Sequence, residues 1–97
     1  MAIGSAINTL TSIATGSYLT IRPPSGVEWI IHNILVADTA DVELYISDGT
    51  NEERVLSTTG GFLDYHFHAT NSIYYKVKNI SGATEYIGYD GIVSKEA

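Results

Sequence analysis

Two histidines, His66 and His68, have a spacing that could bind a metal ion. In a β-strand, residues i and i+2 project from the same face, which would place the two imidazoles about 7 Å apart along the strand. A third ligand, such as His32 or Asp64, would complete a divalent metal site, and so would one histidine from each of three subunits at a three-fold axis. The alternative is a polar outer strand face with Leu63, Tyr65 and Phe67 inward. The regular alternation favours this second interpretation, so we predict no bound metal and no cofactor.

The residues that could support catalysis lack the context that catalysis needs. His32, His66 and His68 would form the metal site of a small cupin-like enzyme, but no second cupin-like motif accompanies them. Ser25 stands in Pro-Pro-Ser-Gly and not in the G-x-S-x-G turn that exposes a nucleophile. The glycine pairs also lack the strand-to-helix setting of a phosphate loop. We therefore predict that the protein is not an enzyme and has no catalytic residues.

The carboxylates that come close together in the sequence lie in or beside predicted turns. These are Asp38 with Asp41, and Asp48 with the pair Glu52 and Glu53. Aspartate in a turn commonly accepts hydrogen bonds from its own backbone. A loop of this kind can also hold calcium, but residues 48–53 lack the spacing of an EF-hand. A structural role in the turns is therefore the favoured interpretation.

Composition restricts the partners. The chain has 97 residues, no cysteine and a formal net charge of −6. An acidic surface without a Lys/Arg cluster repels phosphate backbones, so we predict no nucleic-acid partner. No run of about 18 apolar residues is present, so we predict no membrane partner. Because a domain of this size without disulfides is only modestly stable, oligomerisation is the favoured source of added stability.

The hydropathy pattern predicts an all-β fold. Short apolar stretches alternate with turn signals, as in a sandwich or barrel, and helix-period stripes are missing. Residues 1–14 are predicted to be an N-terminal arm or edge strand, and residues 15–97 a β-sandwich domain. About eight strands at this spacing suit an antiparallel, jelly-roll-like sandwich. An immunoglobulin-like sandwich of about seven strands is the alternative, although its cysteine pair is absent.

The stretch Val27–Ala37 is the longest apolar run and the expected central strand. Strict alternation places Trp29, Ile31 and Leu35 on one face. It places Ile30, Ile34 and Val36 on the other. A strand with apolar residues on both faces must be covered on both sides. We expect the second sheet to cover one face and another subunit to cover the other.

Tyrosine is unusually frequent, with seven residues in the chain. Tyr45 and Tyr74 are predicted on outward strand faces, as is Tyr86. Tyrosine is enriched in protein interfaces and sugar sites because it combines a large apolar ring with a hydroxyl group. Cross-strand packing on a solvated face is the alternative. We favour an interface role.

Two stretches carry a resemblance to a known group of proteins. IRPPSGVEWIIHNI (residues 21–34) followed by VELYISDG (residues 42–49) resembles the small β-sandwich proteins of tailed-phage virions. The shared pattern is a strand, a Pro/Gly turn, a Glu-Trp strand and a hairpin with Asp-Gly. The resemblance covers roughly residues 17–93. It implies a jelly-roll-like capsid decoration or head-fibre protein that forms homotrimers.

The resemblance implies a non-enzymatic protein that binds the major capsid protein and copies of itself. It would be made in the host cytoplasm and would stabilise the phage head from the capsid surface of the virion. A carbohydrate- or receptor-binding module at a tail or fibre tip is the alternative. The residues that we predict at the subunit or capsid interface are Ile3, Ile7, Leu10, Tyr45, Tyr74, His66 and His68.

Overall fold

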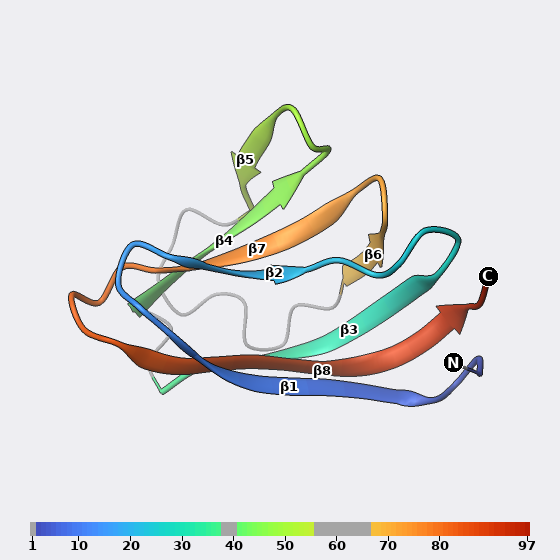
Figure 1. The fold of residues 1–97 in the computed structure, drawn as a ribbon, viewed down its shortest axis with the longest axis horizontal. Helices are drawn as coiled ribbons and strands as arrows, with labels where there is room; N and C mark the ends of the chain where they lie inside the picture. The colour runs from blue at the N-terminus through green and yellow to red at the C-terminus, as the bar shows by residue number, and fades with distance from the viewer. Residues whose placement is uncertain (1, 38–40, 56–66) are drawn as a thin grey trace.

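A computed structural model describes residues 2–37, 41–55 and 67–97. These residues form eight β-strands in two four-stranded sheets (Figure 1). No described segment is a helix that could cross a membrane. The strands are β1 (Ala6–Ile13), β2 (Tyr18–Ile21), β3 (Glu28–Leu35), β4 (Val42–Ser47), β5 (Glu52–Arg54), β6 (Phe67–Thr70), β7 (Tyr74–Asn79) and β8 (Glu85–Lys95).

The strand order confirms the predicted jelly-roll-like sandwich. One sheet has the order β1-β8-β3-β6 and the other β2-β7-β4-β5. The antiparallel pairs are nested, because β1 pairs with β8, β2 with β7, β3 with β6 and β4 with β5. This arrangement is what a long hairpin produces when it is wrapped into two facing sheets, as in an eight-stranded jelly roll. It places the first and last strands side by side.

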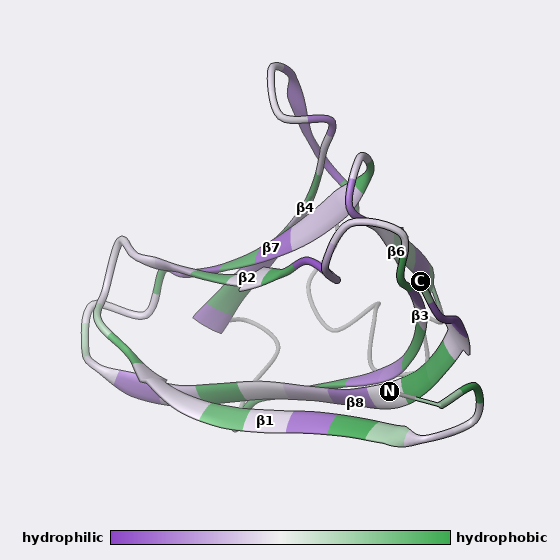
Figure 2. Cartoon of the chain, turned by 45° about the vertical axis from the view of Figure 1, so that its right-hand side comes forward, coloured by the Kyte–Doolittle hydropathy of each residue, from purple (hydrophilic) through white to green (hydrophobic). Residues whose placement is uncertain are grey.

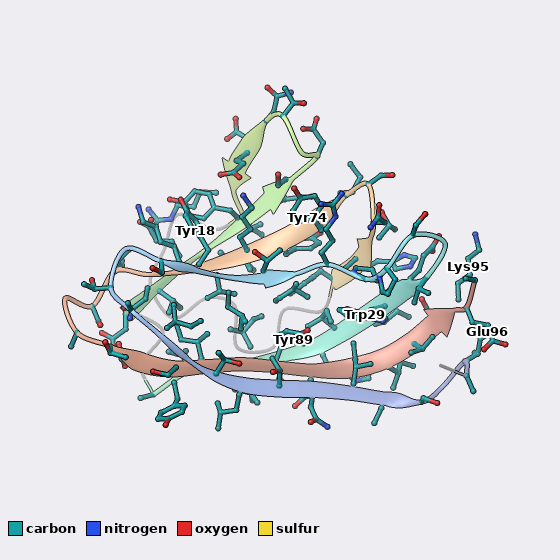
Figure 3. All side chains as sticks on the ribbon, viewed as in Figure 1. Tyr18, Trp29, Tyr74, Tyr89, Lys95 and Glu96 are labelled. Atoms are coloured by element: carbon teal, nitrogen blue, oxygen red, sulfur yellow. The ribbon has the colours of Figure 1, made fainter. Side chains whose placement is uncertain are left out.

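The core lies between the two sheets and is built by period-two alternation. Residues from both sheets are almost completely buried there, including Ile21, Ile31, Leu44, Val77 and Val93. Trp29 of β3 and Tyr89 of β8 also lie between the sheets, with their ring centroids 6.1 Å apart (Figure 3). β-branched and aromatic side chains suit this pleated, close-packed interior.

β3 contains a β-bulge that the strict alternation did not predict. Ile31 pairs with Gly91 and Asn33 pairs with Asp90, so β3 has one residue more than β8 between these pairs. An extra residue reverses which side chains face inward. Trp29 and Ile31 face the core before the bulge, and Ile34 faces it afterwards.

The predicted division of Val27–Ala37 into two faces is therefore wrong, because the residues after the bulge lie on the opposite faces from those predicted. Ile34 and Val36 belong with Trp29 and Ile31 on the core side, whereas Leu35 lies outside. The second sheet covers most of the apolar residues of this strand, so the strand pattern by itself does not require another subunit.

β1 lies at the edge of its sheet, between two similar turns. Ser5 N donates to Ala2 O at 3.0 Å, and Ser17 N donates to Ala14 O at 3.0 Å. Each turn has a glycine with positive φ at its third position, Gly4 at 85° and Gly16 at 81°. Glycine adopts this left-handed conformation without steric cost. The segment predicted as an arm or an edge strand is thus an edge strand over residues 6–13.

Asn79 is a fully buried polar residue that joins the end of β7 to its neighbours. Its side-chain amide donates to Ile13 O at 2.9 Å and to Ala83 O at 2.7 Å. Its side-chain oxygen, Oδ1, accepts a hydrogen bond from Ser81 N at 2.9 Å. Buried polar groups are tolerated when they are hydrogen-bonded in this way. Asn79 therefore fixes the turn before β8 against the end of β1.

Candidate interaction surface

The outer face of the β1-β8-β3-β6 sheet carries a group of exposed apolar side chains. Leu10 of β1 and Leu35 of β3 both lie opposite Gly88 of β8. Tyr86 lies two residues before Gly88 on the same face. These side chains are 62%, 36% and 67% exposed, respectively. We call Leu10, Leu35 and Tyr86 the apolar patch.

The backbone of β8 packs closely against both of its neighbours, β1 and β3. A Cβ atom at Gly88 would lie 2.0 Å from the carbonyl oxygen of Thr9 in β1. A Cβ atom at Gly91 would lie 2.1 Å from the carbonyl oxygen of Ile30 in β3. Gly88 and Gly91 therefore mark a close backbone approach on the two sides of β8. Because Gly88 has no side chain, the surface between Leu10 and Leu35 is open.

A polar cluster on the same face contains His68, Glu28 and Ser94. His68 Nε2 lies 2.9 Å from Glu28 Oε1 and 3.3 Å from Ser94 Oγ. Lys95 Nζ lies 3.8 Å from the other carboxylate oxygen of Glu28. Serine and carboxylate therefore share one ring nitrogen. A catalytic triad needs them on opposite nitrogens, so this cluster is not arranged to activate Ser94.

The described residues test the less favoured interpretation of His66 and His68, a metal site, only in part. His68 lies on the outer face of β6, as the polar-face interpretation predicted, and Phe67 is buried beside it. His32 lies in the bulged part of β3. His66 and Asp64 lie outside the described residues, as do Leu63 and Tyr65. Within residues 2–37, 41–55 and 67–97, no group of three or more possible ligands could hold a metal ion.

Tyr45 lies on the outer face of the second sheet, in contact with charged groups. Its hydroxyl donates to Glu43 Oε1 at 2.6 Å, and Arg54 Nη1 lies 3.3 Å from Glu43 Oε2. Its ring packs edge-to-face on Tyr18, with centroids 6.1 Å apart. The hydrogen bond to Glu43, followed by burial, raises the pKa of Tyr45 to about 12. The outward position was predicted, but the side chain is half-buried and its hydroxyl is engaged.

Tyr74 corrects the prediction of an exposed tyrosine. It lies on the outer side of β7, yet it is only 7% exposed. The guanidinium carbon of Arg22 lies 4.2 Å from the ring centroid, in a cation–π contact. Arg22 is held there because its Nε donates to Asn71 O at 2.9 Å. Tyr74 is therefore covered by its own chain (Figure 3).

The N-terminal candidates separate according to strand alternation. Ile7 faces inward and its side chain belongs to the buried core, so it is not displayed on the outer face as the interface prediction expected. Leu10 lies three residues later and faces outward, as an odd separation in a strand requires. Ile3, in the turn before β1, is 63% exposed. Ile3 and Leu10 are thus available at the surface, and Ile7 is not.

The acidic hairpin between β4 and β5 uses its central aspartate to hold its own turn. Asp48 Oδ1 accepts from Thr50 N at 2.9 Å and from Asn51 N at 2.7 Å. These backbone hydrogen bonds lower the pKa of Asp48. A shallow pocket of about 220 Å³ beside the hairpin has Ile46 and Ile73 in its lining. The structural role predicted for Asp48 agrees with these contacts.

No family model, curated protein or solved structure matches the chain. The candidate interaction surface therefore rests on the exposure and placement of its residues in this chain alone.

Two parts of this surface were missed by reasoning from the sequence. Leu35 was placed on the same strand face as Trp29 and Ile31 because the bulge was not foreseen, and its exposure follows from the extra residue in β3. The contacts of His68 with Glu28 and Ser94 join residues far apart in the chain. Only the strand pairing brings these residues together. Tyr86 was predicted outward, and the structure exposes it more than any other large apolar residue described.

Proposed function

We propose that the protein is a non-enzymatic structural component of a virion, a capsid decoration protein that binds and stabilises a phage head. The observation that carries this proposal is the apolar patch, Leu10, Leu35 and Tyr86, displayed on a rigid sheet. Exposed apolar patches are typical of sites where a protein contacts a partner. The homotrimer is the stoichiometry that the resemblance to phage virion proteins implies.

The physical mechanism would be binding linkage. A protein that binds the assembled shell and not its dissociated subunits stabilises the shell by its binding free energy. Several copies joined together increase the effective affinity without new contacts. The extensively paired β1, β8 and β3 strands suit this role because they hold the patch in one geometry. A preorganised surface loses less conformational entropy when it binds.

The proposed partner is an apolar surface of the major capsid protein. None of the three patch residues carries a charge, and the protein as a whole has a net charge of −6. Contact through the patch would therefore depend on apolar burial, while the acidic remainder would keep the free protein soluble. In this proposal the protein is made in the host cytoplasm and is located on the capsid surface.

A carbohydrate- or receptor-binding module at a tail or fibre tip is the second candidate, and Tyr86 favours it. An exposed tyrosine ring can stack on a sugar, and Tyr86 is 67% exposed. The aromatic residues first considered for this role fit less well. Trp29 and Tyr74 are buried, and Tyr45 is half-buried with its hydroxyl bound to Glu43.

Co-sedimentation with empty shells of the major capsid protein from the same virus tests the proposal. We expect the wild type to pellet with shells saturably and to raise the temperature at which they dissociate. Leu35→Lys should lose both effects because it places a charge in the apolar patch. Thr50→Lys, in the exposed β4–β5 hairpin, is the matched control and should behave as the wild type.

Failure of the wild type to bind shells at any concentration would refute the decoration role. Binding to a glycan array that Tyr86→Ala abolishes and Leu35→Lys preserves would favour the carbohydrate module instead.

A further inference from the structure

The four sheet edges differ in how they are protected from pairing with other chains. β2, β5 and β6 have only four, three and four residues. β2 runs into Arg22-Pro23-Pro24, and every residue of β5 is charged. Short length, charge and proline are the usual means by which edge strands avoid unwanted pairing. These three edges are therefore protected.

β1 has none of these protections. It is eight residues long, and it contains no charged residue and no proline. Among the described strands it pairs with β8 alone, and it runs along the lower border of the sandwich in Figure 1. In an antiparallel edge strand, every second residue directs its N–H and C=O away from the neighbouring strand. β1 thus offers an open, extended hydrogen-bonding edge.

The sequence of this edge reads almost the same in both directions. From Gly4 to Gly16 it is GSAINTLTSIATG, with Leu10 at the centre. Positions equally far from Leu10 are identical or of similar character. The matching pairs are Gly4/Gly16, Ser5/Thr15, Ala6/Ala14, Ile7/Ile13, Asn8/Ser12 and Thr9/Thr11.

We propose that a second copy of this chain pairs antiparallel with β1, across a two-fold axis that passes Leu10. A two-fold contact brings the same surface of each subunit together, so residue i meets j and j meets i. Centred on Leu10, this rule places Ile7 opposite Ile13 of the other copy and Thr9 opposite Thr11. Like residues therefore meet on both faces, which is the cross-strand pairing that stabilises antiparallel sheets. The two sheets join into one sheet of eight strands.

The distribution of charge favours a second copy as the occupant. Two molecules of net charge −6 repel each other, so they approach most easily where both are uncharged. Residues 1–21 contain no Asp, Glu, Lys, Arg or His, and the first charged side chain in the chain is Arg22. β1 lies entirely inside this uncharged segment. The hydropathy colouring of Figure 2 shows apolar and polar residues interspersed along it.

The outer face supports the same register. Leu10 lies in one row with Gly88 and Leu35, so pairing at Leu10 joins this row to its counterpart in the other copy. Asp90 lies opposite Asn8 and hydrogen-bonds Asn33 at 2.9 Å. In the Leu10-centred register Asn8 meets Ser12 of the other copy, so the two Asp90 rows do not meet. A register centred on Asn8 would bring both carboxylates into one row.

This inference goes beyond the proposed function, because the pairing needs no shell. It gives a dimer, or a hexamer of dihedral symmetry if the proposed trimer forms as well.

Cysteine cross-linking tests the register directly, because the chain has no cysteine of its own. Directly opposite Cα atoms lie about 4.5–5.5 Å apart, within the range of a disulfide. We expect Leu10→Cys to form a covalent dimer under mild oxidation. Asn8→Cys and Ser12→Cys should each stay uncross-linked alone, since like positions are then about 13 Å apart along the strand. A mixture of Asn8→Cys and Ser12→Cys should cross-link.

Thr50→Cys, in the exposed β4–β5 hairpin, measures random collisional oxidation. Leu10, Asn8 and Ser12 are exposed, so their variants should keep the wild-type circular dichroism spectrum. Two results would overturn the pairing: oxidation of Leu10→Cys no faster than that of Thr50→Cys, or no preference of the mixture over its separate components. Either result leaves the shell-binding test unaffected, so the two proposals fail independently.

Discussion

The side-chain amide of Asn33 in β3 donates to the carboxylate of Asp90 in β8 at 2.9 Å, on the outer face of the sheet. This pair marks the point at which the two strands resume regular pairing after the bulge. Beyond it, Ile34 faces the core and Leu35 faces outward. One added residue thus converts a strand that looks apolar on both faces into one with a core side and an exposed side.

The bulge predicts unequal effects of two neighbouring truncations. Ile34 is 1% exposed, so Ile34→Ala should lower the free energy of unfolding by about 2–5 kcal/mol through lost packing and a cavity. Leu35 is 36% exposed, so Leu35→Ala should cost about 1 kcal/mol or less. Urea unfolding at one fixed protein concentration measures both values. Equal losses would contradict the inward and outward assignments.

Gly88 should tolerate no larger residue. In Gly88→Ala the new methyl group would meet the Thr9 carbonyl oxygen, so β1 must move away from β8. We expect a loss of about 2–3 kcal/mol in the free energy of unfolding, as for other overpacked sites. Thr84→Ala, at an exposed position before β8, is the matched control and should change stability by less than about 0.5 kcal/mol. A fully stable Gly88→Ala variant would mean that the two strands are farther apart than described.

Asn79 should be one of the most sensitive polar positions in the fold. Asn79→Ala removes the amide that donates to the carbonyls of Ile13 and Ala83, although the Ala83 carbonyl keeps a hydrogen bond from the Ser81 hydroxyl at 3.0 Å. A buried polar group that loses its partner costs about 1–3 kcal/mol, so we expect a loss in this range. Asn8→Ala, on the exposed face of β1, should be nearly neutral. Denaturant unfolding of both variants gives the comparison, and similar values would contradict the buried network.

Tyr45 should make stability depend on alkaline pH. Its pKa is raised from 10.0 to about 12 by the hydrogen bond to Glu43, with burial as the next cause. The folded protein therefore holds this proton more tightly than the unfolded chain does. The resulting stabilisation is complete below pH 10 and is lost as the pH rises from 10 to 12.

The measurement for Tyr45 is ultraviolet absorbance of the phenolate during alkaline titration. The difference between wild type and Tyr45→Phe should show one tyrosine that ionises near pH 12. The unfolding free energies of the two proteins should also converge as the pH approaches 12. A difference spectrum with its midpoint at pH 10 would show that the bond to Glu43 does not form in solution.

Much of the fold could be predicted because alternation and turn chemistry are local. Tyr75 and Val77 face inward on β7, as their spacing required, and Asp48-Gly49 forms the expected hairpin turn. The bulge in β3 could not be predicted, because an apolar run does not show where one residue is extra. Because the prediction did not include this extra residue, it placed Ile34 and Leu35 on the wrong faces of the strand.

The candidate surface could be predicted only in part, because burial on an outer face depends on distant segments. Arg22 covers Tyr74 from another part of the chain, and no local pattern shows this contact. The spacing of Ile7 and Leu10 suits a helix or an arm equally well, and only the strand conformation separates their faces. The near-palindrome of residues 4–16 is visible in the sequence, but it gains a structural meaning only when β1 is known to be a sheet edge.

The most direct test of self-association through β1 is the native mass of the wild type and of Leu10→Lys over the micromolar range. The wild type should form particles with an even number of chains. Leu10→Lys should give fewer of them, because it places two like charges beside the two-fold axis. A wild type that stays a single chain at every concentration would contradict self-association. A particle of three chains would contradict pairing at β1 while agreeing with the proposed trimer.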